Sequence, residues 1–363
     1  MSIYLLKSPS NLDWKKDNKL KIINFSILAL SFCAPQVMAE GYDFYGRLDY
    51  SVTHSDSGSA THNNKSGTVL ENNFSLLGVK GSSPLTDTVS IFYQIEMGVN
   101  SGSQDNTDKP FSARPTFLGV KHDNFGALAL GRIDPVFKMA KGTSDAMDMY
   151  AMKHDRLFAG DKRWGDSLEY KSTRWNHLQL GVSYLMEDNY YSETDNRRDN
   201  GNYQLALTYG DKHFKIGKWY VAAAYSDGVE DIEAYRAVLQ YKWDKLQLST
   251  MLQHSELVNT DKPDWQQREG NGFILSAKYQ LDRLLLKAQY GQDDSGTGLI
   301  ANRIYASKTL FIDEVPDVSQ WALGAEYKLS KSARLHSEIG QFDVKQYSSF
   351  DDTIVSIGMR YDF

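Results

Sequence analysis

The chain ends in Val355-Ser-Ile-Gly-Met-Arg-Tyr-Asp-Phe363, in which every second side chain is apolar or aromatic. The intervening positions carry Ser356, Gly358, Arg360 and Asp362. A repeat of two residues places the two sets of side chains on opposite faces of an extended strand. These nine residues therefore predict a β-strand with one apolar face and one polar face.

The same alternation recurs through most of the chain after residue 40. In Val89–Met97, for example, Ile91, Tyr93 and Ile95 alternate with Phe92, Gln94 and Glu96. Sixteen such segments begin near residues 42, 73, 88, 113, 125, 166, 177, 202, 218, 234, 245, 272, 283, 319, 333 and 353. Each is about nine to eleven residues long, which is the length of a tilted strand that crosses a membrane.

The connections between these segments alternate in length. Short links lie around Pro84, Asn124, Arg174, Lys215, Asp244, Asp282 and Ser330. Long polar links cover about 54–70, 100–112, 134–164, 187–201, 255–270 and 292–317, and two links on the same side, near 228–232 and 346–351, are shorter. Short turns at one end and long loops at the other are typical of transmembrane β-barrels. We predict an all-β fold, a 16-stranded antiparallel transmembrane β-barrel with both termini on the periplasmic side.

A water-soluble β-sandwich would also show alternating strands. Its buried face would be the apolar one, with charged residues exposed. Here the polar face carries Arg, Lys, Glu and Gln on nearly every predicted strand, too many charges to bury in a dry core. A large barrel with a water-filled interior accommodates them. Aromatic residues also recur at the ends of the apolar faces, as in the aromatic belts of membrane proteins.

The N-terminal segment has the pattern of a signal peptide. Lysines precede an apolar run from Ile22 to Ala34, and Val37 and Ala39 supply the small residues of a cleavage site. The run is too short for a transmembrane helix. We expect residues 1–39 to be removed and residues 40–363 to form the barrel domain. Residues 1–17 are either part of this long leader or a spurious extension of the reading frame.

Removal of this leader changes the chemistry that remains. Cys33, the single cysteine, would leave with it, so disulfides and thiolate metal sites are not expected. The leader carries five lysines and two aspartates, and subtracting its charge of +3 from −6 leaves about −9. This balance disfavours a nucleic-acid partner and suggests a weak preference for cations. No motif indicates a cofactor or a metal.

Four short motifs, in this order and spacing, carry a family resemblance. They are Tyr42-Asp-Phe-Tyr-Gly-Arg-Leu-Asp49, Leu77-Gly-Val-Lys-Gly81, Phe117-Leu-Gly-Val-Lys121 followed by Phe125-Gly-Ala-Leu-Ala-Leu-Gly-Arg132, and the terminal Met359-Arg-Tyr-Asp-Phe363. Over nearly the whole predicted barrel the chain resembles the trimeric general (non-specific) outer-membrane porins of Gram-negative bacteria. The resemblance implies a homotrimer with one pore per subunit that passes small hydrophilic solutes and ions down their gradients.

In the family that this chain resembles, the third external loop folds into the barrel and narrows it. The corresponding loop here covers about 134–164 and contains Asp145, Asp148, Asp155 and Asp161. A loop of this length in a compact domain is usually functional. The resemblance therefore implies a constriction loop, with Asp145 and Asp148 as its key acids, although the family's usual Pro-Glu-Phe-Gly-Gly-like turn is absent.

The family also places basic residues on the wall opposite this loop. The matching positions here are Arg47, Lys80, Arg114 and Arg163, whereas Leu76 stands where an arginine is usual. Unlike charges facing one another across confined water would produce a transverse field that screens solutes by size, dipole and charge. The alternative is that these residues are ordinary charges lining a wide channel.

Two further roles come from the resemblance. Arg132 corresponds to an arginine near the subunit contact, where Asp105 or Asp108 of a neighbour would form a latch; a plain surface charge is the alternative. Tyr361 and Phe363 match the C-terminal signal read by the barrel assembly machinery. Lipid and lipopolysaccharide of the outer membrane are the other expected partners.

Three other functions compete with a general diffusion pore. A substrate-selective channel for sugars or anions would line its lumen with aromatic or lysine ladders, and no consecutive aromatic ladder is present. A barrel enzyme would need a fixed Ser–His or Asp–His pair at the rim. His254-Ser255 and His336-Ser337 place their side chains on opposite strand faces, so we expect no enzyme. An adhesive role of the long loops is a further alternative.

Overall fold

The computed structural model describes residues 41–102, 109–186, 202–258, 268–307, 310 and 312–363. The predicted signal peptide, Asp105 and Asp108 lie outside these residues. The first eight strands are Tyr42–Ser55 (β1), Gly67–Asn72 (β2), Leu76–Pro84 (β3), Val89–Val99 (β4), Phe111–His122 (β5), Gly126–Arg132 (β6), Ser167–Lys171 (β7) and Leu178–Leu185 (β8). The next nine are Tyr203–Gly210 (β9), Trp219–Asp227 (β10), Ile232–Trp243 (β11), Leu246–Leu257 (β12), Glu269–Leu281 (β13), Leu284–Asp293 (β14), Val318–Lys328 (β15), Ala333–Val344 (β16) and Asp352–Asp362 (β17).

Helical segments in the described residues are short and lie in the connections. They are Val136–Ala140 (α1), His154–Arg156 (η1), Val229–Asp231 (η2), Leu299–Tyr305 (α2) and Ser348–Phe350 (η4). Neither α-helix has the length and hydrophobicity that a helix needs to cross a membrane.

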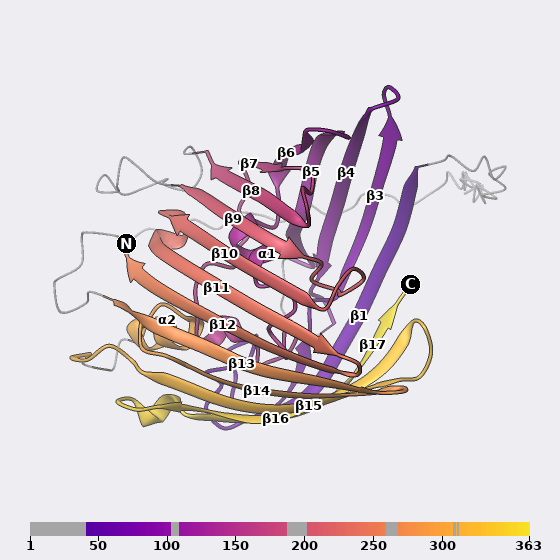
Figure 1. Cartoon of the computed structure of the whole chain (residues 1–363). Helices are drawn as coiled ribbons and strands as arrows, with labels where there is room; N and C mark the ends of the chain where they lie inside the picture. Colours follow the sequence, from indigo (N-terminus) through magenta and orange to yellow (C-terminus); the bar gives the residue numbers. More distant parts are fainter. Residues whose placement is uncertain (1–40, 103–108, 187–201, 259–267, 308–309, 311) are drawn as a thin grey trace, which may run out of the picture. The chain divides into compact units, whose positions relative to one another are not determined.

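All seventeen strands belong to one antiparallel sheet that closes on itself through β1 and β17. The first half of β1 pairs with β3 and the second half with β2, so β2 and β3 share one position in the wall. The barrel therefore has sixteen strand positions, as predicted. Figure 1 shows the neighbouring strands following one another in chain order around the wall.

The second position is where the sequence interpretation was least accurate. We expected a loop over 54–70 and a strand beginning near residue 73. Instead β1 continues to Ser55, β2 already pairs with it from Gly67, and the break falls at residues 73–75, where Phe74 has φ 64°. The other fifteen predicted strand starts lie within three residues of the observed ones.

The two faces of the wall differ as the alternation predicts. Outward-facing side chains are apolar and exposed, for example Phe44 (77 %), Leu323 (52 %) and Ile357 (64 %). Inward-facing positions carry buried polar groups such as Gln289 and Glu338. An exposed apolar belt is costly in water, and a lipid environment removes that cost.

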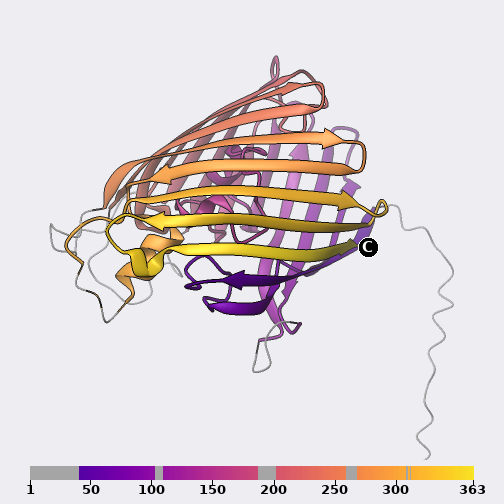
Figure 2. The same cartoon turned by 90° about the horizontal axis from the view of Figure 1, so that it is seen from below.

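The barrel also has two unlike ends. Figure 2 shows tight hairpins at the end where the C-terminus lies and longer connections, with helix α2, at the other end. We call these the short-turn end and the long-loop end. Buried apolar residues from the connections and the inner wall form a core inside the barrel, including Phe137, Met147, Phe158, Ile300 and Phe342.

Candidate functional site

Residues 133–166, here called the inner loop, connect β6 to β7 and lie along the inner face of the wall. The backbone N–H of Val136 donates to Ser183 Oγ on β8 (3.0 Å). Farther along, the N–H groups of Ala146 and Ala151 donate to Gln289 Oε1 on β14 (2.8 Å) and Glu338 Oε1 on β16 (2.9 Å). The loop thus crosses the inner wall from β8 to β16, and Figure 1 draws α1 within the curve of the sheet.

Helix α1 anchors the start of the inner loop. It follows Pro135, and its Val136, Phe137 and Ala140 are buried against the wall. The Tyr220 hydroxyl of β10 donates to the Ala140 carbonyl (3.1 Å), and the Arg236 guanidinium lies 4.2 Å from the centre of the Phe137 ring. Apolar contact and a cation–π contact together hold this short helix in place.

A cluster of buried charges holds the rest of the inner loop to the wall. Asp161 accepts a hydrogen bond from Arg236 Nη1 (2.8 Å) and lies 3.2 Å from Lys141 Nζ and 2.8 Å from His154 Nε2. The other imidazole nitrogen of His154 lies 2.7 Å from Asp145 Oδ2. We call Lys141, Asp145, His154, Asp161 and Arg236 the loop ion cluster.

The charges of this cluster stabilise one another. Burial by itself raises the pKa of Asp161, but Arg236 and Lys141 beside it hold that pKa well below its usual value. Burial likewise opposes ionisation of Asp145, yet the adjacent His154 lowers the pKa of Asp145. Burial and Lys141 lower the pKa of His154, but Asp161 and Asp145 outweigh them and raise it. The neighbouring opposite charges therefore favour the charged forms of Asp145, His154 and Asp161.

The four acids noted in the sequence are each paired with a cation. Asp145 and Asp161 belong to the loop ion cluster. Asp148 lies 2.7 Å from Lys141 Nζ, and its side chain is 51 % exposed. Asp155 lies 2.6 Å from Lys153 Nζ and accepts from Arg156 Nη1 at 2.7 Å. Of these four acids, Asp148 is thus the most accessible to water.

The basic residues noted in the sequence have partners of their own. Arg47 Nε donates to Asp362 (3.0 Å), Arg114 Nε to Glu96 (2.5 Å) and Arg163 Nε to Asp134 (2.6 Å). Lys80 Nζ lies 5.3 Å from the centre of the Tyr45 ring. Across the residues that the structure describes, no ion pair joins Arg47, Lys80, Arg114 or Arg163 to Asp145, Asp148, Asp155 or Asp161.

Arg163 lies near the end of the inner loop and pairs with Asp134 at its start. Its partner Asp134 also pairs with Lys138 (2.8 Å), one turn along. Burial by itself would raise the pKa of Asp134. The charges of Lys138 and Arg163 lower the pKa by more than burial raises it, to about 2. This pair of contacts fixes the point where the loop leaves β6.

Arg114 instead belongs to a polar group on the inner faces of β1, β4 and β5. The Tyr45 hydroxyl donates to Glu96 Oε2 (2.8 Å), and Gln94 Nε2 donates to the Tyr45 oxygen (2.9 Å). Arg114 sits at an irregularity in the β4–β5 register and lines a cavity of about 230 Å³ with Phe74. Its charge is therefore adjacent to open space.

Sequence reasoning missed several residues that hold the inner loop, among them Arg236, Glu338 and Glu230. Arg236 and Glu338 lie on polar strand faces, so their direction follows from the alternation, but nothing in the sequence indicates their partners. Glu230 precedes β11 and accepts from the N–H groups of Gly160 (3.1 Å) and Lys162 (2.5 Å). No sequence signal identifies it.

The residues assigned to assembly lie on the outer side. Arg132 has the same strand parity as the exposed Leu128 and Leu130, and its buried Nε has no hydrogen-bond partner within the described ranges. Tyr361 and Phe363 are exposed on the outer face. The backbones of Phe363 and Gly46 exchange two hydrogen bonds (2.8 and 3.0 Å), which completes the β17–β1 seam.

Three potential metal-ligating groups lie together in the inner loop. Ligand atoms of Asp145, Asp148 and His154 fall within 4.8 Å of one another. Lys141 already pairs with Asp148, and Asp161 and Asp145 contact the two nitrogens of His154. The arrangement is accounted for as an ion-pair network.

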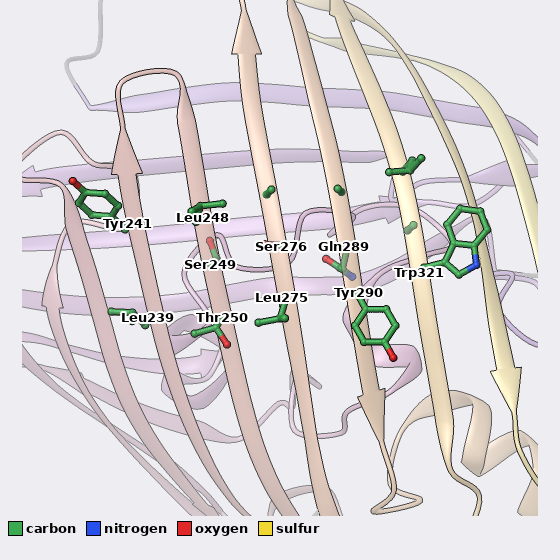
Figure 3. Close-up of a pocket in the computed structure, with 14 residues that line it drawn as sticks. Leu239, Tyr241, Leu248, Ser249, Thr250, Leu275, Ser276, Gln289, Tyr290 and Trp321 are labelled. Carbon is green, nitrogen blue, oxygen red and sulfur yellow. The ribbon is translucent and has the colours of Figure 1, made fainter.

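A cavity of about 700 Å³ lies on the outer surface of β11–β15. Figure 3 shows Leu248, Leu275, Tyr290 and Trp321 among the side chains that line it. Its lining is largely apolar, so it belongs to the apolar belt and not to the polar lumen.

A family model described as Gram-negative porin matches residues 26–347. This chain belongs to the Gram-negative porin family. The porin is accordingly an outer-membrane channel protein of the Gram-negative type.

Individual relatives agree with this assignment. The porin is 21 % identical over 331 residues to outer membrane porin F of Xenorhabdus nematophila, covering 88 % of this chain and 81 % of that one. Among solved structures, the anion-selective porin from Comamonas acidovorans superposes with TM-score 0.64 at 16 % identity, covering 89 % and 99 % of the two chains. A trimer form of OmpT, an outer-membrane protein of Vibrio cholerae, gives 0.61 at 16 % identity, covering 89 % and 100 %. At these identities the structural matches support the fold.

Proposed function

We propose that this porin is a general diffusion channel that passes small hydrophilic solutes and ions, that it acts as a homotrimer with one pore per subunit, and that the inner loop narrows each pore. The observation that supports this best is the path of the inner loop. It is held to the inner wall from β8 to β16 by hydrogen bonds and by the loop ion cluster. A loop fixed inside a barrel reduces the cross-section of its lumen.

Reconstitution of the purified protein in planar bilayers tests the proposal. A trimer with one pore per subunit gives current steps in which three equal levels open or close. Flux that rises linearly with solute concentration supports general diffusion. Saturable flux, or a current blocked by one sugar or anion, supports the selective channel instead. Absence of any conductance from correctly folded protein overturns the assignment.

Within this channel we propose that Arg47, Lys80, Arg114 and Arg163, together with Asp145 and Asp148, set the field at the constriction. Arg114 is the best single test because it lines a cavity and pairs with Glu96. The substitution Arg114→Ala leaves the Glu96 carboxylate without its cation, so the lumen becomes more negative. We expect the anion-to-cation permeability ratio to fall about twofold, the change that one charge about 8 Å from an ion produces in moderately salty water.

Reversal potentials in a potassium chloride gradient measure this ratio. The matched control is Glu96→Gln, which removes the opposite charge from the same pair and should raise the ratio. Equal conductance and selectivity in the wild-type protein and both variants would remove Arg114 from the constriction.

The remaining assignments are also proposals. Residues 1–39 act as a cleaved signal peptide. The C-terminal Tyr361 and Phe363 are read by the barrel assembly machinery, and their exposure on the outer face supports this role.

A further inference from the structure

Six cations line one continuous part of the inner wall. Consecutive strands β13 to β17, followed by β1, each supply one of them. We call the set the basic arc: Lys278, Lys287, Lys328, Arg334, Arg360 and Arg47. Successive residues of a strand face the lumen and the outside in turn. Each of these cations stands at a lumen-facing position, next to an exposed apolar residue such as Tyr279, Leu286 or Met359 that faces outward. All six therefore project towards the lumen.

Within the arc, like charges stand directly opposite one another. In the strand register Lys278 faces Lys287, and Arg334 faces Lys328 on one side and Arg360 on the other. Like charges at directly opposite positions destabilise a sheet. A wall selected for stability alone would place a carboxylate at one position of each pair.

Two carboxylates reduce this repulsion without cancelling it. Glu326 forms ion pairs with Lys287 and with Arg334, the latter at 3.2 Å. Asp362 accepts from Arg47 (3.0 Å) and Arg360 (2.8 Å), and it lies 3.6 Å from Arg334. Six cations thus share two carboxylates that contact them.

Five other acids with inward parity lie on these six strands, and in the described residues none of them forms an ion pair with the arc. Asp49 is buried and lies 2.9 Å from His336 Nε2. Glu338 is buried and accepts from the N–H groups of Ala151 and Met152. Asp293 and Asp352 lie at the long-loop end, where they accept hydrogen bonds from Ser295 and Ser55, and Asp43 is exposed at the start of β1. Within the described residues, Glu326 and Asp362 are therefore the two carboxylates that form ion pairs with the arc.

One end of the arc contacts the inner loop. Lys278 Nζ donates to the Thr143 carbonyl (2.8 Å), and Lys287 Nζ lies 5.0 Å from the centre of the Tyr150 ring. At the other end the side chains are accessible to water, with Arg334 25 % exposed and Arg47 20 % exposed. The arc therefore leads from the narrowed region into the open lumen on the side of the short-turn end.

We propose that the basic arc makes this porin prefer small anions over cations. Fixed charges on a low-dielectric wall raise the local concentration of oppositely charged ions, and charged side chains that line a pore set its selectivity. The guanidinium groups of Arg334 and Arg360 in addition match the geometry of carboxylates and phosphates. The preference is opposite to the one that the net charge of the chain suggests, because permeating ions respond to the charges nearest to them. The inference rests on the proposed channel function.

Reversal potentials in a potassium chloride gradient test the proposal on the full-length refolded protein. The wild-type potential should have the sign of chloride preference. In the double variant Arg334→Gln/Arg360→Gln the chloride-to-potassium permeability ratio should fall about fourfold, since each charge contributes about twofold at this range and ionic strength. Lys331→Gln/Lys345→Gln removes the same charge from exposed positions outside β16 and should leave the ratio unchanged.

Two further variants separate charge from folding. Arg334→Lys/Arg360→Lys keeps the charge and should retain chloride preference. Glu326→Gln removes a negative charge that contacts the arc and should increase the chloride preference. A wild-type channel that prefers potassium, or a control variant that shifts as far as the arc variant, overturns the inference while leaving the channel function intact. Loss of all conductance in the wild-type protein would instead defeat the channel function itself.

Discussion

Gly46 lies under the ring of the C-terminal residue at the seam that closes the barrel. A Cβ atom at this position would fall 2.4 Å from the Phe363 ring, closer than any real contact. The ring and the glycine are thus complementary across β1 and β17, an arrangement in which an aromatic side chain covers the backbone of a glycine.

We predict that Gly46→Ala weakens the seam. The added methyl group forces the Phe363 ring away, and overpacking of this kind costs typically 1–3 kcal/mol. The temperature at which the refolded barrel unfolds, followed by circular dichroism in detergent, should fall. Gly165→Ala is the matched control, because a Cβ there meets nothing within 4 Å. An unchanged unfolding temperature for Gly46→Ala would show that the ring contact does not stabilise the seam.

At the scale of elements, the inner loop depends on Asp161. Its carboxylate contacts Arg236, whose side chain is completely buried. The substitution Asp161→Asn leaves that guanidinium charge buried without a carboxylate, a change that costs about 3–5 kcal/mol. We expect the loop to detach from the wall, with a larger and noisier single-channel current. Asp148→Asn should have a much smaller effect, because Asp148 is half exposed and exposed pairs contribute about 0–1 kcal/mol. Equal effects of the two substitutions would contradict the role of the buried cluster.

Two buried groups of the inner loop, His154 in the loop ion cluster and Asp134 at the start of the loop, predict a dependence of stability on pH with a definite sign. The pKa of His154 is raised in the folded protein, so the charged imidazole stabilises the folded state. This contribution to the free energy of unfolding is complete below the unfolded pKa of about 6.5 and is lost as pH rises through the folded pKa. The pKa of Asp134 is lowered to about 2, so its contribution is complete above about 4 and is lost as pH falls through about 2. Both contributions are complete only between about pH 4 and 6.5.

The measurement compares unfolding temperatures of the wild-type protein and His154→Gln from pH 5 to 10. The difference between them should be largest at pH 5 to 6.5 and should narrow at higher pH, where the wild-type imidazole loses its proton. A difference that stays constant over this range would mean that His154 contributes by packing and not by its charge.

The strands could be predicted from sequence, whereas the contacts of the inner loop could not. A wall between lipid and water imposes a two-residue repeat on every strand, so local sequence is sufficient to locate β4 or β17. The break at Phe74 escaped this reasoning because it depends on the continuation of β1 to Ser55, where β2 pairs with it. The loop was recognised by its length. Its ion pairs depend on residues far apart in the chain, such as Asp161 and Arg236, and no repeat in the sequence records them.

At the scale of the whole molecule, the direction of most wall residues was predictable but their electrostatic surroundings were not. Arg47 lies on an inward face, as the alternation predicts. Arg114 has the parity of the exposed Thr116 and Leu118, and it turns towards Glu96 because the β4–β5 register shifts beside it. Each is nevertheless paired with a carboxylate on a neighbouring strand, Asp362 or Glu96. A strand pairs with neighbours that are close in sequence or, at the seam, with the far end of the chain. The register at the seam, and with it the pairing of Arg47, emerges only when the barrel closes.

Assembly of subunits provides the last prediction. Arg132 has outward parity at the long-loop end of β6, and its Nε has no hydrogen-bond partner in the described part of this subunit. A carboxylate from a neighbouring subunit would satisfy this group, and Asp105 and Asp108 are the acids expected to supply it. We therefore predict that Arg132→Gln lowers the temperature at which the proposed homotrimer separates into monomers on detergent gels, while the folded monomer keeps its own unfolding temperature. Asp105→Asn/Asp108→Asn should reproduce the effect, and combining it with Arg132→Gln should add little, because both changes remove the same contact. If the effects of the acid and arginine substitutions add in full, Arg132 and these acids do not form one latch.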